Sequence, residues 1–194
     1  MIFRSFVFIT ILLLMNSCGG EVNYNTNPNE VAFRLNSVVL TLPKDFKKIE
    51  DFEAIKFADK QLTEVMKLRE TDFTTFFIKE KDGEVVSLIQ LATRGRRVEI
   101  NGENFDQFLS IVKSINSQYT QSGMNSVLVE ENLEHKGTPK YFKVKTKITG
   151  LEGEEWMMSH YLMSNEVRTA QVSVFNLNAD DDDLEKFMKR TMLF

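Results

Sequence analysis

The chain has 194 residues and a net charge of −4 at pH 7, from 24 Lys and Arg against 28 Asp and Glu. This mild acidity argues against general nucleic-acid binding, which requires a dense basic face. The composition, 42% hydrophobic and 27% charged, is that of an ordinary globular protein, and the length suits one domain with a sizeable core. Sixteen Phe against four Tyr and one Trp favour a well-filled core over a surface that stacks on sugars.

A ten-residue apolar stretch, FVFITILLLM at 6–15, follows a single basic residue, Arg4. It is too short to cross a membrane, which takes roughly 20 apolar residues, but it has the length of the apolar core of a secretory signal. Small residues then flank Cys18, the one cysteine of the chain. This pattern resembles the bacterial lipoprotein signal, which implies cleavage after Ser17 and lipid attachment at Cys18. An ordinary signal peptide and an apolar cytoplasmic N-terminus are the other interpretations.

The resemblance divides the chain into a signal peptide, 1–17, a lipidated cysteine with a flexible tether, 18–31, and a single domain, 32–194. Arg4 is the only charged residue of the signal, so cleavage would leave 23 basic and 28 acidic residues and a net charge of −5. The resemblance also implies two or three acyl chains, which hold a protein on a membrane stably where one chain does not. Gly19 after the cysteine favours the outer membrane over the inner membrane.

The first predicted element of the domain is a hairpin. Apolar residues alternate over 32–42 on both sides of the turn pair Asn36-Ser37. Pro43 ends the second strand, because it has no N–H to donate to a neighbouring strand. Further along, apolar residues at helical spacing predict a short helix over 58–69.

A second hairpin turns at Lys81-Asp82-Gly83, where glycine supplies the positive φ of a tight turn. The strongest predicted helix is 103–121. Its apolar face repeats at helical spacing and consists of Phe105, Phe108, Leu109, Val112, Ile115 and Tyr119. Acidic residues near its start and Gly123 beyond its end suit the two termini of a helix.

Four strand-like segments joined by turn-forming residues follow, at 126–134, 140–148, 155–163 and 167–176. Lysines alternate with apolar residues in the second segment, and we interpret them as the solvent-facing side of an outer strand: Lys143, Lys145 and Lys147. The third segment is apolar on both faces, which is typical of a central strand. A terminal helix is predicted from Asp180, with acidic residues first and basic residues later.

Adjacent strands joined by short turns favour an α+β fold, with a mainly antiparallel sheet flanked by helices. The order of elements, together with the motif LPKDF at 42–46, resembles the PsbP-like fold, an α/β/α sandwich. The resemblance covers 32–194. Its family includes extrinsic proteins of photosystem II and many small bacterial lipoproteins, and it implies a binding or assembly role with no catalytic residues to transfer.

Patterns that carry catalysis or bind metals are sparse. We interpret His135, in a polar turn, as solvated and His160 as a core or sheet-surface residue, since neither lies in a nucleophile motif. Two histidines without an available thiol do not make a zinc site. A calcium loop would use Asp180 and Asp182, but other residues stand at the positions where such a loop requires Gly and Glu. We therefore interpret the acidic stretch as the start of a helix, with weak calcium binding as the alternative. No phosphate-loop motif appears, and no cofactor is expected.

One basic cluster, Arg94, Arg96 and Arg97, lies between a predicted strand and the long helix. Guanidinium groups suit carboxylates and phosphates, so this cluster is the candidate patch for contact with an anion. A partner's acidic surface and a lipid headgroup both have the required charge. The alternative is a strand end that is simply solvated.

The sequence therefore predicts a non-enzymatic lipoprotein of the bacterial cell envelope. It would be held at the membrane by lipid on Cys18 and would bind an envelope protein partner and no nucleic acid. The many Phe and Met residues prompt a second hypothesis, a carrier of a small ligand or lipid in a cavity between sheet and helices. A hydrolase that depends on His160 is the third.

Overall fold

The computed structural model describes residues 27–35, 37–50, 52, 55, 75–94, 96–134, 136, 137, 139–177 and 184–194. Four predicted features lie outside these residues. They are the N-terminal signal with Cys18, the helix over 58–69, the turn residue His135, and the acidic stretch that begins at Asp180.

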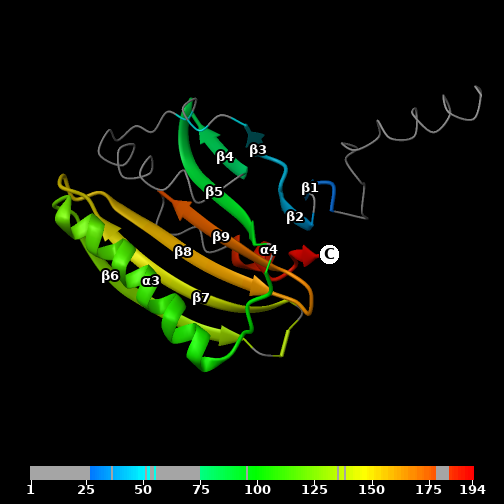
Figure 1. The fold of residues 1–194 in the computed structure, drawn as a ribbon. Helices are drawn as coiled ribbons and strands as arrows, with labels where there is room; N and C mark the ends of the chain where they lie inside the picture. Colours follow the sequence, from blue (N-terminus) through cyan, green and yellow to red (C-terminus); the bar gives the residue numbers. More distant parts are fainter. Residues whose placement is uncertain are drawn as a thin grey trace, which may run out of the picture.

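The main sheet contains seven strands, and every neighbouring pair is antiparallel. Its spatial order is β3 (Phe46–Ile49), β4 (Thr75–Lys81), β5 (Glu84–Arg94), β9 (Thr169–Asn176), β8 (Glu155–Ser164), β7 (Lys140–Thr149) and β6 (Asn125–Glu134). The predicted meander is confirmed, because β6, β7, β8 and β9 follow one another in the chain and in the sheet. The predicted central strand is β8, between β7 and β9 (Figure 1).

A smaller sheet joins the two ends of the domain. It consists of β1 (Glu30–Leu35), β2 (Val38–Pro43) and the two-residue β10 (Met192–Leu193), which pairs with β2. The described part of the predicted terminal helix is a single turn, α4 (Glu185–Met188), and the chain then continues into β10. The C-terminal segment thus lies against the opening hairpin (Figure 1).

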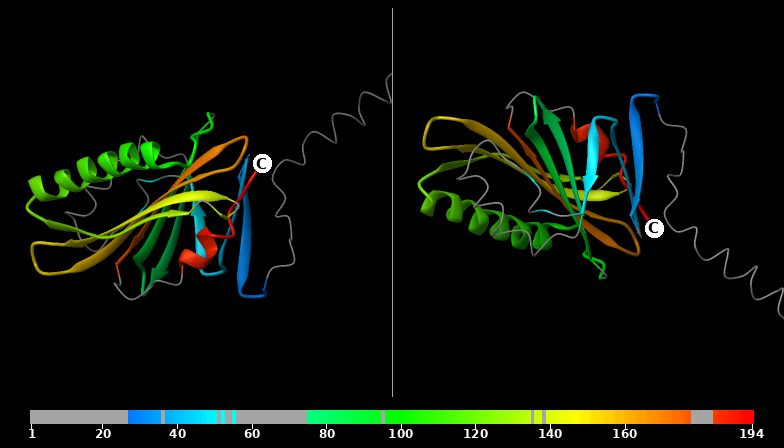
Figure 2. Two further views of the ribbon diagram at one scale, coloured as in Figure 1. Left: turned by 90° about the horizontal axis from the view of Figure 1, so that it is seen from below. Right: turned by 90° about the horizontal axis from the view of Figure 1, so that it is seen from above.

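The long helix α3 (Gly102–Gln121) covers one face of the main sheet, over β6 and β7. Figure 2 shows α4 and the smaller sheet on the other side. On the α3 side the core contains Ile100, Phe108, Val112, Phe142, Val144 and Leu162. On the opposite side α4 contributes Phe187 and Met188 to a larger core with residues of β2, β5, β8 and β9. The sheet is therefore buried on both faces, as in an α+β sandwich.

Local turn chemistry explains where the hairpins form. Gly83 has φ of 85°, as the sequence predicts for the β4–β5 turn, and Asp82 also has a positive φ, of 55°, which was not predicted from the sequence. Leu35 pairs with Val38, which confirms a two-residue turn between β1 and β2. Strand β3 was not predicted. It has four residues, two of them Lys, and it forms because it pairs with β4.

The interpretation of the β7 lysines as a solvent-facing row is wrong for two of the three. Strand β7 is an inner strand between β8 and β6, and the face opposite α3 is covered. Lys143 is 3% exposed and Lys145 is 9% exposed, whereas Lys147 still reaches solvent and pairs with Glu155. Alternation alone shows that lysines share a face, but not whether another element covers that face.

Gly150 provides a test of the β7–β8 connection. Its backbone N–H donates to the carbonyl of Glu154, and a Cβ at this position would lie 2.8 Å from Cη2 of the buried Trp156 ring. We expect Gly150→Ala to lower the free energy of unfolding by about 1–3 kcal/mol in urea denaturation, because the ring must shift. Gly102→Ala is the control, since nothing lies within 4 Å of its added Cβ, and its stability should be unchanged or slightly higher. Equal effects of the two changes would contradict the packing argument.

Candidate functional site

The three predicted arginines lie where the chain passes from β5 to α3. Arg94 is the last residue of β5, and Arg96 and Arg97 follow in the connection to the helix. The N-cap of α3 is Asn101, whose side chain accepts a hydrogen bond from the Asn104 N–H at 2.9 Å. The connection is thus held by a helix cap at its far end.

A second contact holds the middle of this connection. The Val98 N–H donates to the Thr169 hydroxyl at 2.7 Å, which ties the connection to the first residue of β9. The Asn104 side chain also donates to the Glu99 carbonyl at 2.9 Å. These contacts fix the backbone that carries Arg96 and Arg97.

The arginines border two separate hollows. Arg94 and Arg96 line the first, of about 420 Å³, between α3 and the ends of β5, β8 and β9, which we name the α3 groove. Arg97 lines the second, of about 440 Å³, which we name the loop hollow. The sequence predicts one basic patch, and the structure divides it between two sites.

The α3 groove combines cations, amides and apolar walls. Arg94 donates to the Gln171 side-chain carbonyl at 3.0 Å, so its guanidinium is held against β9. Asn104 and Gln107 of α3 line the groove beside it. Its remaining walls are apolar and consist of Val98, Phe108, Ile111, Ile115 and Leu162.

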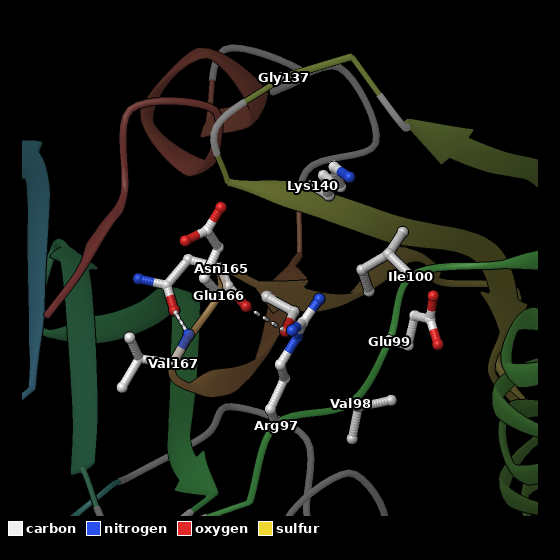
Figure 3. Close-up of a pocket in the computed structure, with 10 residues that line it drawn as sticks. Arg97, Val98, Glu99, Ile100, Gly137, Lys140, Asn165, Glu166 and Val167 are labelled. Carbon is white, nitrogen blue, oxygen red and sulfur yellow. Dashed lines mark hydrogen bonds between the residues drawn. The ribbon is translucent and has the colours of Figure 1, made fainter.

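The loop hollow is more polar, and its charges balance. It lies between the β5–α3 connection, the β6–β7 loop and the β8–β9 turn. Figure 3 shows Arg97 and Lys140 on its walls together with Glu99 and Glu166. The Asn165 side chain accepts from the backbone N–H groups of Val167 and Arg168, which shapes the β8–β9 turn beside the hollow (Figure 3).

Charge distinguishes the two hollows. The loop hollow is lined by two cations, Arg97 and Lys140, and by two carboxylates, Glu99 and Glu166. It therefore has no strong preference for an anion. Among the described residues that line the α3 groove, two are Arg and none is acidic. Arg96 and Arg97 form no ion pair within the described ranges, and both are exposed. The groove is therefore the more favourable of the two for an anion.

A second charged cluster is buried on the opposite face of the sheet. The Lys143 ammonium contacts Glu130 of β6 at 2.7 Å and Glu185 of α4 at 2.5 Å. Burial by itself lowers the pKa of Lys143, but the hydrogen bonds to the two carboxylates outweigh it and raise the pKa above its ordinary value. The cluster joins β6, β7 and α4, so it acts as a structural cross-link.

The same cluster affects the groups around it. Burial raises the pKa of Glu185, but hydrogen bonds from Lys143 and Lys189 outweigh burial and hold that pKa below its ordinary value. Burial also raises the pKa of the Tyr161 hydroxyl, and the nearby Glu185 carboxylate raises it further. Tyr161 therefore stays neutral at physiological pH.

His160 is a core residue, as one of its sequence interpretations states. It is fully buried in β8, and its Nδ1 lies 2.8 Å from the Ser173 hydroxyl on β9. His135, Cys18 and the acidic stretch at 178–183 fall outside the described residues. Within the described ranges no three His, Cys, Asp or Glu side chains are grouped so that they could hold a metal ion. None of the described helices is long and apolar enough to span a membrane.

Several groove residues were not identified from the sequence. Asn104, Gln107, Leu162 and Gln171 come from three elements that only folding brings together. Ile111 could have been identified from the sequence as an exposed apolar residue, because it lies off the predicted apolar face of the long helix. Its side chain is 57% exposed in the structure.

With the fold described, the protein can be compared with known ones. No protein-family model matches the sequence, and no curated protein matches it. Among solved structures, the solution structure of cyanobacterial PsbP (CyanoP) from Synechocystis sp. PCC 6803 matches with a TM-score of 0.58 at 8% identity, over 93% of this chain and 99% of that chain. The antiparallel α+β sandwich is thus a PsbP-like fold, which confirms the predicted fold class.

Two further structures match less well. A crystal structure from Bacteroides thetaiotaomicron VPI-5482 has a TM-score of 0.45 at 12% identity, over 81% of this chain and 45% of that one. A protein of unknown function from Pseudomonas aeruginosa has a TM-score of 0.36 at 8% identity, over 84% and 92% of the two chains. At these scores neither supports an argument about this protein.

The buried Lys143 cluster leads to a prediction about stability and pH. Lys143→Met should lower the free energy of unfolding by roughly 2 kcal/mol at pH 7, because it leaves two partly buried carboxylates without their cation. The pKa of Glu185 is lowered from 4.5, so its stabilising contribution is complete above that pH and is lost as pH falls further. The difference between wild type and variant should therefore shrink between pH 5 and pH 3 in urea denaturation.

Lys47→Met is the matched control for this prediction. Lys47 pairs with Glu80 at 3.2 Å, but its side chain is 71% exposed, so the change should cost less than about 1 kcal/mol. A loss at Lys143 no larger than the loss at Lys47 would show that the buried cluster does not cross-link the sheet and α4.

Proposed function

We propose that the protein is a membrane-anchored lipoprotein of the bacterial cell envelope, and that its PsbP-like domain binds a protein partner and catalyses no reaction. The observation that carries the proposal is the placement of Arg94, Arg96 and Arg97 at one end of the sheet. Arg96 and Arg97 are exposed without an acidic partner in the part of the chain that the structure describes. Guanidinium groups in that state suit carboxylates on another protein.

The order of the segments along the chain supports a tethered binding domain. Cys18 would carry the lipid, and residues 19–31 would form a tether that reaches roughly 40 Å when fully extended. Strand β1 begins at Glu30, so the last two residues of this segment already belong to the described domain. With a net charge of −5 after cleavage, the chain has no general attraction to anionic lipid, so membrane residence would depend on the acyl chains.

The likeness to CyanoP supports the proposal through the fold alone. A PsbP-like domain has the compact, doubly covered sheet that a binding module needs, with connections free to present charged residues at its ends. In this chain the β5–α3 connection is such a place, and two contacts from its backbone and helix cap hold it in one conformation. We place the protein at the outer membrane, on the basis of Gly19 after the lipidated cysteine.

The arginines should decide partner binding. We expect crosslinking in intact cells to join the protein to one reproducible partner. The triple change Arg94→Gln, Arg96→Gln and Arg97→Gln should reduce that product tenfold or more, because it removes three charge-assisted contacts while the side chains remain polar. The readout is the crosslinked band, identified by mass spectrometry.

Arg34, Lys81 and Lys113 make the matched control, since all three are exposed cations elsewhere on the domain. Their triple change to Gln alters the net charge equally and should leave the crosslinked product unchanged. If both triple variants lose it to the same extent, net charge rather than the arginine patch governs association. If the wild-type protein forms no reproducible crosslinked product, the partner-binding proposal fails.

The lipid anchor has its own test. Metabolic labelling with palmitate should mark the wild-type protein and not Cys18→Ser, and globomycin should cause a larger, unprocessed form to accumulate. The variant should appear in the soluble fraction after cell disruption, because the acyl chains supply the membrane affinity. Ser17→Ala is the control and should be labelled like wild type. An unlabelled wild-type protein would rule out the lipoprotein assignment while leaving the domain and its partner untouched.

A further inference from the structure

The α3 groove changes in polarity along its length. Asn104 and Gln107, in the first turns of α3, line one end of it, and Ile111 and Ile115 line the other. At 1.5 Å per helical residue, positions 104 and 115 lie about 16 Å apart along the helix axis. A ligand aligned with α3 would therefore meet polar groups at one end and aliphatic groups at the other.

The groove is positively charged. Arg94 and Arg96 line it, and Arg96 lies only five residues before the N-cap of α3, Asn101. The hydrogen bond from Arg94 to Gln171 occupies only one of the five N–H donors of that guanidinium. The N-terminal end of the 20-residue helix α3 adds a partial positive charge on the same side. A negatively charged group placed here would meet two guanidinium groups, with no carboxylate among the described lining residues to oppose it.

The apolar end is open to solvent. Phe108 of α3 and Leu162 of β8 are buried and form the floor, whereas Ile111 is 57% exposed above it. An exposed isoleucine beside a preformed apolar floor is surface that a ligand chain can cover, with a favourable free energy proportional to the apolar area removed from water. The volume of about 420 Å³ is in the range of small-molecule sites.

The sheet beneath α3 offers one more polar group close by. Ala92 of β5 pairs with Gln171 of β9. Gln90 lies two residues before Ala92 in β5, so the side chains of Gln90 and Ala92 are on the same face of the sheet. Gln90 is 1% exposed, and its side-chain nitrogen donates no hydrogen bond within the described residues. Buried donors are normally satisfied, so this side of the sheet still has hydrogen-bonding capacity next to the groove.

We propose that the α3 groove binds a small amphipathic anion, an unbranched aliphatic chain with a carboxylate at one end. The carboxylate would contact Arg94 and Arg96, and the chain would lie along Phe108, Ile111 and Leu162. This function shares Arg94 and Arg96 with the proposed partner binding, but it does not use Arg97 or the loop hollow. It gives the ligand-carrier hypothesis a defined site and a defined ligand chemistry.

The test is a titration of the mature chain, residues 18–194 with Cys18→Ser, followed by NMR of its isoleucine methyl groups. The probes are decanoate below its micelle concentration, decanol and acetate. Decanoate should bind saturably and shift the Ile111 and Ile115 methyl resonances. Decanol should bind at least tenfold more weakly and acetate without saturation, because each lacks one half of the required chemistry.

Variants then separate the two halves of the site. Arg94→Gln with Arg96→Gln should weaken decanoate binding tenfold or more and leave decanol binding unchanged. Arg97→Gln is the matched control, since it removes a neighbouring arginine that lines the other hollow, and it should bind decanoate like wild type. Ile111→Gln should weaken both decanoate and decanol.

Any of five outcomes would overturn the proposal. Four of them are no saturable decanoate binding, equal affinity for decanoate and decanol, an unchanged affinity in the double arginine variant, and shifts confined to methyl groups outside the groove. Shifts produced by phosphatidylglycerol vesicles but not by free decanoate would also overturn it, because the site would then recognise a membrane surface. The crosslinking of a protein partner is measured separately with all three arginines changed, so either proposal can fail while the other holds.

Discussion

The structure depends on covering both faces of a seven-stranded antiparallel sheet. One long helix, α3, covers β6 and β7, and on the same face Phe52 and Ile55 pack with residues of β4 and β5. Between these two covers, near the ends of β5, β8 and β9, the face is only partly closed, and that opening is the α3 groove. Among the described residues, the groove therefore lies at the edge of the cover that α3 provides, and Arg94 and Arg96 line it because β5 ends there.

The elements that cover the opposite face of the main sheet explain why the Lys143 ammonium is buried. The strand β7 carries lysines at alternate positions, and α4 and the smaller sheet pack over that face of the main sheet. Lys143 can be buried there only because Glu130 and Glu185 meet its ammonium, one from the neighbouring strand and one from α4. The C-terminal segment is thus held twice, by this ion-pair cluster and by the pairing of β10 with β2.

The two functional proposals use different properties of one small region. Partner binding draws on exposed guanidinium groups that a flat acidic surface can reach, and ligand binding draws on a groove with a charged end and an apolar end. The β5–α3 connection serves both, because Arg96 lines the α3 groove and the next residue, Arg97, lines the loop hollow.

Local patterns in the sequence were sufficient for most of the elements. The helical spacing over 103–121, the Asp82-Gly83 turn and the alternating meander strands predict their elements because short-range sterics and the apolar period decide them. The same patterns could not predict β3 or β10, which are too short to have a period of their own and form by pairing with distant strands. Long-range packing alone decided that Lys143 is buried, that Arg94 and Arg96 share a groove with Ile111, and that Arg97 faces a different hollow. Those outcomes depend on which residues from other elements arrive at the same place, and no local pattern encodes that.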